Sequence, residues 1–196
     1  MGHKVGWVTL HAGIAGGADI ILLPEIPYDM DVIAEAIDKR VKSGKKFTII
    51  AVAEGAISKE DAKLSKKELK DKQAKKKYPS VAYEMAEKVQ KRTQQEVRIA
   101  IPGHTQRGGS PCPFDRVLST RLGAEAARAI LDEDYGCMMS VKNDKIVRVP
   151  LSEVAGKLKY VDPKLRSSDR QRSPELVLEM NNNHVIYGFI PEIPAK

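Results

Sequence analysis

The amino-acid sequence predicts an α/β fold, a mostly parallel sheet with flanking helices. Three short and nearly continuous apolar runs, at 19–23, 47–53 and 97–101, are typical of strands buried on both faces of a parallel sheet. Segments with apolar residues at helical spacing separate these runs, as crossover helices between parallel strands would. With 42% hydrophobic and 30% charged residues in a chain of 196, the composition is that of a globular protein.

The segment between the first two runs is predicted to be an amphipathic helix. Its apolar residues recur at helical spacing: Met30, Ile33, Ile37 and Val41. Acidic Asp29 and Asp31 open it, and basic residues followed by Gly44 close it, as the helix dipole and the helix caps prefer. We therefore interpret the two aspartates as capping residues and not as a metal pair.

A second helical stretch precedes the third apolar run, with apolar residues at Val81, Ala82, Met85, Ala86 and Val89. Before it, the segment 59–77 is crowded with lysine and has no sustained apolar stripe. Charge runs of this kind are usually solvated, so we expect a solvated helical excursion or mobile insertion, with an anion-binding arm as the alternative.

A glycine-rich loop at 103–113 follows the third run, and a helix with apolar residues from Val117 to Ile130 follows the loop. The segments 137–141 and 145–149 are predicted to form a hairpin around Asn143-Asp144. The remainder, 151–196, is expected to hold a short helix and an irregular tail. These patterns divide the chain at about residues 109 and 150.

Composition disfavours several classes of function. The net charge of +7 could favour nucleic acid, but aromatic residues make up only 5%, too few for stacking platforms, and much of the basic excess lies in the lysine-rich segment. No apolar run approaches the roughly 18 residues of a membrane span, so we expect a cytoplasmic protein without membrane contact. Cys112 and Cys137, the only cysteines, are expected to be reduced.

Chemistry-bearing residues follow each predicted strand. Glu25 follows the first, Glu54 the second, and the glycine-rich loop with His104 and Arg107 the third. In open α/β sheets, ligands bind outside the carboxyl ends of the strands, so these side chains are expected to share one crevice. Arginine and histidine suit phosphate oxygens and a carboxylate accepts from hydroxyls, which indicates a sugar phosphate. Taken singly, each has an ordinary alternative as a turn residue, helix cap or surface acid.

Arg98 lies at the beginning of the third predicted strand, before His104. At about 3.3 Å per residue the two are roughly 20 Å apart along a strand, too far to meet at one ligand. We therefore expect Arg98 either to serve the site of a neighbouring molecule or to be an exposed surface arginine.

At these residues the chain resembles 6-phosphofructokinase. The resemblance extends over roughly residues 1–143, in the family's order, and rests on these segments: Met1-Gly2, Gly6-Trp7, Ala15-Gly16-Gly17-Ala18-Asp19, Pro24-Glu25, Ala53-Glu54-Gly55, Gly103-His104-Thr105-Gln106-Arg107-Gly108-Gly109-Ser110-Pro111 and Asp115-Arg116. The resemblance implies phosphoryl transfer from ATP or pyrophosphate, with Mg²⁺, to the 1-hydroxyl of fructose 6-phosphate in glycolysis.

The resemblance also implies roles for individual positions. The substrate-binding positions fall on Met1, Gly2, His3, Glu54, Arg98, His104 and Arg107, with Arg98 lent by the adjacent subunit of a homo-oligomer. His3 stands where the family has arginine. Asp19 and Lys45 fall on effector-binding positions of bacterial members, whereas Ser43 replaces a lysine there.

Two segments of the family, a Gly-Gly-Asp nucleotide loop and a Thr-Ile-Asp-Asn-Asp catalytic segment, do not occur in this sequence. The chain is therefore expected to be the C-terminal portion: a fructose-6-phosphate-binding part at 1–109, and an incomplete second domain at 110–150 whose helix exposes apolar residues. We expect no catalytic residue, no bound metal or nucleotide and no turnover by this chain alone. The alternative is a non-catalytic sugar-phosphate-binding or subunit-interaction module that requires a separate donor-binding chain.

Overall fold

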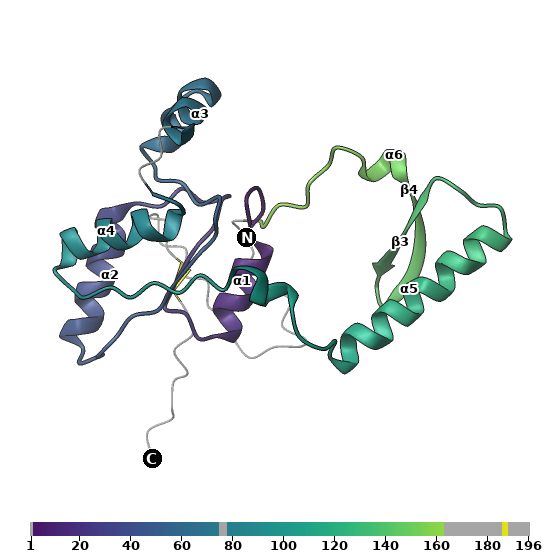
Figure 1. The fold of residues 1–196 in the computed structure, drawn as a ribbon, viewed down its shortest axis with the longest axis horizontal. Coiled ribbons are helices and arrows are strands. Elements are labelled where there is room, and N and C mark those ends of the chain that lie inside the picture. The colour runs from purple at the N-terminus through teal and green to yellow at the C-terminus, as the bar shows by residue number, and fades with distance from the viewer. Residues whose placement is uncertain (1, 75–77, 163–185, 188–196) are drawn as a thin grey trace, which may run out of the picture. The chain divides into compact units, whose positions relative to one another are not determined.

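The computed structural model describes residues 2–74, 78–162 and 186–187. The chain divides into two units (Figure 1). Unit 1 comprises residues 1–101 and 160–196, and unit 2 comprises residues 102–159. The boundaries expected from the sequence, at about 109 and 150, stay a prediction. None of the described helices is long and apolar enough to cross a membrane.

Unit 1 is an α/β layer structure. In chain order its elements are α1 (Trp7–Ala15), β1 (Ile20–Leu22), α2 (Met30–Lys42), β2 (Ile50–Val52), η1 (Asp61–Lys63), α3 (Lys66–Ala74), α4 (Val81–Thr93) and β5 (Ile186–Tyr187). The sheet order is β2-β1-β5, in which β1 pairs parallel with β2 and antiparallel with β5. The described sheet thus confirms a parallel β1-α2-β2 unit, with one antiparallel strand added.

The core of unit 1 lies on both faces of β1. Because side chains alternate along a strand, Ile20 and Leu22 join one apolar cluster with α2 and α4, and Ile21 joins another with α1. Every residue of β1 is buried. This two-sided burial explains why the first apolar run is continuous in the sequence rather than alternating.

Helix α2 begins and ends as its sequence predicts. The carboxylate of Asp29 accepts a hydrogen bond from the backbone N–H of Asp31 at 2.9 Å, which confirms Asp29 as the N-cap. The ammonium of Lys59 also lies 3.3 Å from this carboxylate. Burial alone would raise the pKa of Asp29, but these donors outweigh it and hold the pKa below its ordinary value. Gly44, with φ of +82°, follows the last helical residues.

The third predicted strand is wrong. Residues 97–101 form no strand; only Val97 packs against the core, while Ile101 is exposed and the side chain of Arg98 is 89% exposed. Neither of the described sheets, β2-β1-β5 in unit 1 or the hairpin of unit 2, includes this segment. The strand-based distance between Arg98 and His104 therefore has no support. The lysine-rich segment does contain a helical excursion, α3, as expected.

Unit 2 packs one helix against a hairpin. Its elements are η2 (Gly103–Arg107), α5 (Pro113–Leu131), β3 (Cys137–Lys142), β4 (Lys145–Pro150) and α6 (Leu151–Val154). The hairpin is confirmed: Lys142 pairs with Lys145, and both residues of the Asn143-Asp144 turn have positive φ, 50° and 58°. Helix α5 begins with Pro113, and Asp115 accepts from the N–H of Cys112 at 3.0 Å.

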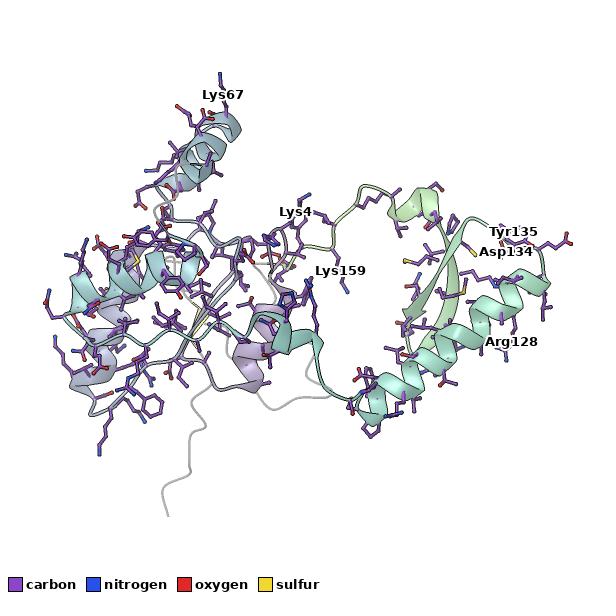
Figure 2. The ribbon with its side chains drawn as sticks, viewed as in Figure 1. Lys4, Lys67, Arg128, Asp134, Tyr135 and Lys159 are labelled. Atoms are coloured by element: carbon purple, nitrogen blue, oxygen red, sulfur yellow. The ribbon has the colours of Figure 1, made fainter. Side chains whose placement is uncertain are left out.

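The apolar core of unit 2 is small. Within residues 102–159, Ala129 is the one buried residue. The guanidinium of Arg148 on β4 joins three carboxylates, Glu125 at 2.9 Å, Asp132 at 2.8 Å and Asp134 at 3.2 Å. These carboxylates hold the pKa of Arg148 above its ordinary value. Figure 2 shows Arg128, Asp134 and Tyr135 near the end of α5.

Exposed apolar residues lie along α5, as predicted: Phe114, Val117, Ile130 and Leu131, the last 83% exposed. The two cysteines are free, with Cys112 exposed and Cys137 half-buried. A short helix, α6, is present at the start of the C-terminal segment. The rest of the tail prediction lies at 163–185 and 188–196, outside the described residues.

Candidate functional site

The carboxyl ends of β1 and β2 meet at one edge of the sheet in unit 1. The strands are parallel, and the N–H of Ala53, just past β2, donates to the carbonyl of Leu22 at 2.9 Å. Glu25 and Glu54 therefore both follow strands that end at the same edge. The two strand ends thus meet at one edge as expected, while the shared crevice of the two side chains stays a prediction.

The N-terminal segment lies directly on the loop that holds Glu54. The N–H of Gly55 donates to the carbonyl of Gly2 at 2.9 Å, and Nε2 of His3 lies 3.5 Å from Oε2 of Glu54. A Cβ atom built on Gly55 would lie 2.1 Å from the carbonyl oxygen of His3, so the approach requires glycine. The structure thus brings Gly2, His3 and Glu54 together; Met1 lies outside the described residues.

Both polar side chains of this group remain accessible to a ligand. The side chain of His3 is 75% exposed and that of Glu54 is 44% exposed. An exposed carboxylate beside an imidazole can accept from and donate to hydroxyl groups. This arrangement is able to orient a polyhydroxylated molecule, but it holds no preassembled nucleophile and base.

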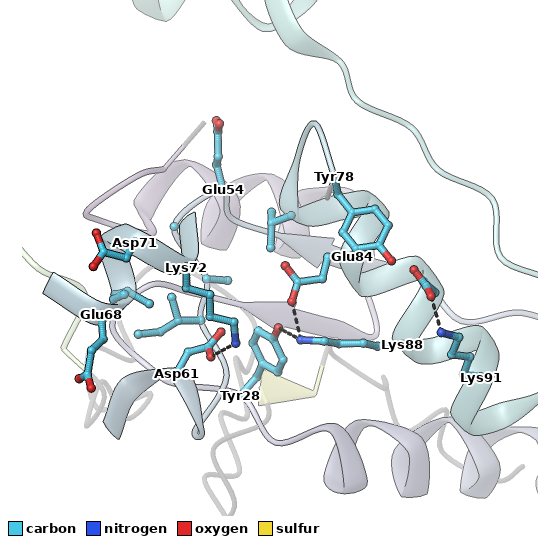
Figure 3. Close-up of a pocket in the computed structure, with 16 residues that line it drawn as sticks. Tyr28, Glu54, Asp61, Glu68, Asp71, Lys72, Tyr78, Glu84, Lys88 and Lys91 are labelled. Atoms are coloured by element: carbon cyan, nitrogen blue, oxygen red, sulfur yellow. Dashed lines mark hydrogen bonds and ion pairs between the residues drawn. The ribbon is translucent and has the colours of Figure 1, made fainter. Parts of the chain in front are cut away.

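A cavity of about 750 Å³ opens beside Glu54 (Figure 3), a volume within the usual range for small-molecule sites. Figure 3 shows Glu54 at its rim, with the carboxylate directed away from Tyr28. Loop residues 54–57, the insertion with α3, and α4 form the walls. The cavity therefore combines segments on either side of the lysine-rich insertion.

Each lysine of the cavity wall belongs to an ion pair. Lys72 lies 2.5 Å from Asp61, Lys88 lies 2.6 Å from Glu84, and Lys91 pairs with Glu87. Lining acids outnumber lysines, so the cavity is a poor place for the phosphate group of a ligand. The sequence offered Lys72 only within the alternative of an anion-binding arm at 59–77 and assigned Glu84, Glu87, Lys88 and Lys91 to no site; the i,i+4 spacing of Glu84 and Lys88 was the available signal.

Lys88 is also held against Tyr28. Its ammonium lies 3.4 Å from the hydroxyl oxygen and 5.7 Å from the ring centroid of Tyr28. Burial raises the pKa of Tyr28, and Lys88 opposes part of this rise. Burial would lower the pKa of Lys88, but Glu84 and Tyr28 outweigh it and raise the pKa, so the side chain stays cationic.

His104 and Arg107 lie in unit 2, on the 3₁₀ turn η2, and both are exposed. Gly103 and Gly109, on either side of the turn, have positive φ of 52° and 87°, which is why the loop is glycine-rich. Glu54 belongs to unit 1, so the convergence of all three at one phosphate ester stays a prediction.

The other predicted residues have local partners. Nε of Arg98 donates to Glu96 at 3.1 Å. Asp19 bridges Arg40 at 2.8 Å and the N–H of Ile49 at 2.8 Å, and its side chain is 18% exposed. Lys45 is exposed. Their substrate and effector roles stay predictions, and Asp19 is already bound within the fold.

The described residues contain no group of three or more His, Cys, Asp or Glu side chains placed to hold a metal ion. Trp7 and His11 lie on α1 with ring centroids 5.6 Å apart in an edge-on contact. Thr9 on the same helix is buried. His184 lies outside the described residues.

Known proteins are similar to this chain in sequence. The phosphofructokinase family profile matches residues 1–130. An ATP-dependent 6-phosphofructokinase of Spirochaeta thermophila is 48% identical over 163 residues, covering 83% of this chain and 44% of the relative. A pyrophosphate–fructose 6-phosphate 1-phosphotransferase of Amycolatopsis methanolica is 41% identical over 164 residues, covering 83% and 48%. The chain thus spans less than half the length of these curated relatives.

Solved structures agree. Phosphofructokinase from Saccharomyces cerevisiae aligns with a TM-score of 0.64 at 34% identity, covering 78% of this chain and 19% of that chain. A pyrophosphate-dependent phosphofructokinase from Marinobacter aquaeolei aligns with a TM-score of 0.67 at 21% identity, covering 86% and 42%, and shows the shared fold alone. The α/β fold class expected from the sequence is confirmed.

Proposed function

Because this chain belongs to the phosphofructokinase family, we propose that it supplies the acceptor site for phosphoryl transfer to the 1-hydroxyl of fructose 6-phosphate. The donor is ATP or pyrophosphate, since the relatives include enzymes named for each. The reaction belongs to glycolysis in the cytoplasm.

The observation that supports this proposal is the contact between the N-terminal segment and the loop after β2. It places His3 within 3.5 Å of Glu54 at the sheet edge where ligands of such folds bind. Glu54 accepts from the sugar hydroxyls, and Met1, Gly2 and His3 bound the sugar. His104 and Arg107 donate to the 6-phosphate, because charge-assisted donors suit its oxygens.

A neighbouring subunit completes the phosphate site in this proposal. The side chain of Arg98 is 89% exposed and pairs with Glu96 at the surface, so its guanidinium can reach a second chain in a homo-oligomer. Asp19 and Lys45 provide the effector contact, which requires Asp19 to exchange Arg40 for the effector.

No residue of these 196 is assigned to the donor, to Mg²⁺ or to catalysis. Phosphoryl transfer needs a donor, a metal ion and a positioned base together, and this chain's residues orient only the acceptor. We infer that the chain alone binds fructose 6-phosphate without turning it over. Formation of fructose 1,6-bisphosphate by the purified chain in a steady-state assay would contradict this inference.

Calorimetric titration with fructose 6-phosphate tests the acceptor site. Replacing Arg107 by alanine removes a charge-assisted phosphate contact and should weaken binding by about 1.5–3 kcal/mol, roughly 10- to 100-fold in Kd. Arg128→Ala is the matched control, because Arg128 is an exposed arginine of the same unit that pairs with Glu125 at 3.2 Å. Equal Kd values for wild type and Arg107→Ala would remove Arg107 from the site.

A second candidate function is a subunit-interaction module that pairs with a donor-binding chain. The exposed apolar residues of α5 favour it, Phe114 and Val117 at its start and Leu131 at its end, because exposed apolar side chains are typical of interaction surfaces. This candidate predicts binding of an apolar dye by the isolated chain above that of a compact globular control. Dye binding no greater than the control would count against it.

A further inference from the structure

Glu25 connects three separate stretches of unit 1. Its Oε1 accepts from the N–H of Gly6 at 2.9 Å and from the N–H of Val161 at 3.0 Å. Gly6 is the N-cap of α1, and Val161 is a buried residue just after the chain returns from unit 2. One carboxylate oxygen therefore holds the start of a helix and a distant part of the chain.

The carboxylate is confined by packing as well as by these bonds. A Cβ atom built on Gly6 would lie 2.9 Å from Oε2 of Glu25 and 2.7 Å from Cδ2 of Leu23. Oε2 is buried and has no hydrogen-bond partner among the described residues. A buried oxygen without a partner is costly, and the two hydrogen bonds that Oε1 accepts offset this cost.

The bond to Gly6 fastens one end of the segment that carries His3. The other end is fastened where the carbonyl of Gly2 accepts from the N–H of Gly55 at 2.9 Å. His3 lies between these two points, with Nε2 3.5 Å from Glu54. Only three residues separate Gly2 from Gly6. A displacement of Gly6 while Gly2 stays bound therefore changes the position of His3, which lies between them.

We propose that Glu25 is a positioning residue of the acceptor site: through the amide of Gly6 it sets His3 beside Glu54, and through the amide of Val161 it ties this arrangement to the returning chain. The ligand in this inference, fructose 6-phosphate, rests on the proposed function. Glu25 acts through backbone amides, so it is not a catalytic residue.

A double-mutant cycle between Glu25 and His3 tests the proposal by calorimetric titration with fructose 6-phosphate. Each single change, Glu25→Ala or His3→Ala, should raise Kd by about 3- to 10-fold, the range of one ordinary hydrogen bond. If Glu25 acts by placing His3, the double variant should bind no more than about twofold worse than either single variant. Multiplying effects would overturn the proposal.

A measurement without ligand separates this inference from the proposed function. In the otherwise wild-type chain, Glu54→Gln should change the NMR chemical shifts of the His3 ring, because the two side chains are in contact. In a chain that carries Glu25→Ala, the same Glu54→Gln change should leave the chemical shifts of the His3 ring unaltered. Glu25→Gln keeps one oxygen acceptor and should restore most of the response, while Glu35→Ala, an exposed glutamate on α2, should leave it unchanged.

The outcomes of the two experiments distinguish the positioning role of Glu25 from the proposed function. A His3 response that persists in Glu25→Ala, or that is the same in the alanine and glutamine variants, overturns the positioning role. If Glu25→Ala does not fold, a shortened Glu25→Asp variant, whose carboxylate cannot reach both amides, takes its place in both experiments, and Glu25→Gln remains the rescuing variant. Absence of fructose 6-phosphate binding by the wild type would reject the proposed function, and the resonance measurement would still decide the role of Glu25.

Discussion

Replacing Gly55 by alanine should disturb the candidate site more than it disturbs the core. The new Cβ atom would lie 2.1 Å from the carbonyl oxygen of His3, 2.6 Å from its carbonyl carbon and 2.9 Å from the carbonyl oxygen of Gly2. All of these are backbone atoms, so no side chain can rotate to make room. The N-terminal segment must move away from the loop that carries Glu54.

The size of the effect follows from these distances. Cβ atoms essentially never approach within 3.0 Å of another heavy atom, so the two backbones must separate by about 1 Å. Such overpacking typically costs about 1–3 kcal/mol, and the bond from the N–H of Gly55 to Gly2 would be weakened at the same time. For a chain of this size, about 2 kcal/mol corresponds to a fall in Tm of about 4–8 °C.

Thermal unfolding followed by circular dichroism, together with titration of fructose 6-phosphate, measures both consequences. Gly55→Ala should lower Tm and weaken binding. Gly123→Ala is the control: no atom lies within 4 Å of its added Cβ, and it lies inside α5, where alanine should stabilise by about 0.5–1 kcal/mol. A Gly55→Ala chain with the wild-type Tm and the wild-type Kd would refute the close approach of the two segments.

Three further changes test the fold. Asp29→Ala removes the N-cap of α2 and should lower the free energy of unfolding by about 1 kcal/mol near neutral pH. Because the pKa of Asp29 is lowered from 3.8, the cap's contribution is present above that pH and is lost as pH falls below it, so urea titrations of wild type and variant should converge in acid; a constant difference would argue against it. Ile33→Ala, at a side chain with 0% exposure, should cost about 2–5 kcal/mol in the same assay, against about 0.5–1.5 for Ile33→Val. Asn143→Ala, at φ of 50°, should cost about 1 kcal/mol and speed amide exchange in β3 and β4, whereas unchanged exchange would contradict the turn assignment.

The elements that the sequence predicted correctly are those whose signals lie within the element itself, or that several independent signals indicate. Helix α2 shows an apolar stripe, an acidic cap and a basic end, and each of these acts within the helix itself. The hairpin follows from two adjacent residues that tolerate positive φ. Residues 97–101 show the limit, since an apolar run becomes a strand only if a neighbouring strand accepts its hydrogen bonds. Strand β5, at 186–187, pairs with β1, which lies more than a hundred residues earlier in the sequence. No local sequence pattern indicates a pairing between segments so far apart.

The candidate site was predicted in part for the same reason. Glu25 and Glu54 come to one sheet edge through the ends of parallel strands, a rule that applies to the whole fold class. The role of Glu25 depends on Val161, far away in the chain, so its sequence position at a strand end indicated a ligand contact where the structure has backbone contacts. The contact between Tyr28 and Lys88 likewise joins the loop after β1 to α4. These two residues are far apart in the sequence and belong to no common motif that would predict their contact.

The two units should respond unequally to ionic strength. Unit 1 is held by two apolar clusters, which dissolved ions do not screen. Unit 2 has Ala129 as its one buried residue in the described range and depends on Arg148 and its ring of carboxylates, which lie within reach of counterions. Raising the salt concentration to about 1 M shortens the Debye length to about 3 Å, so the helix and hairpin of unit 2 should loosen first while the sheet stays intact.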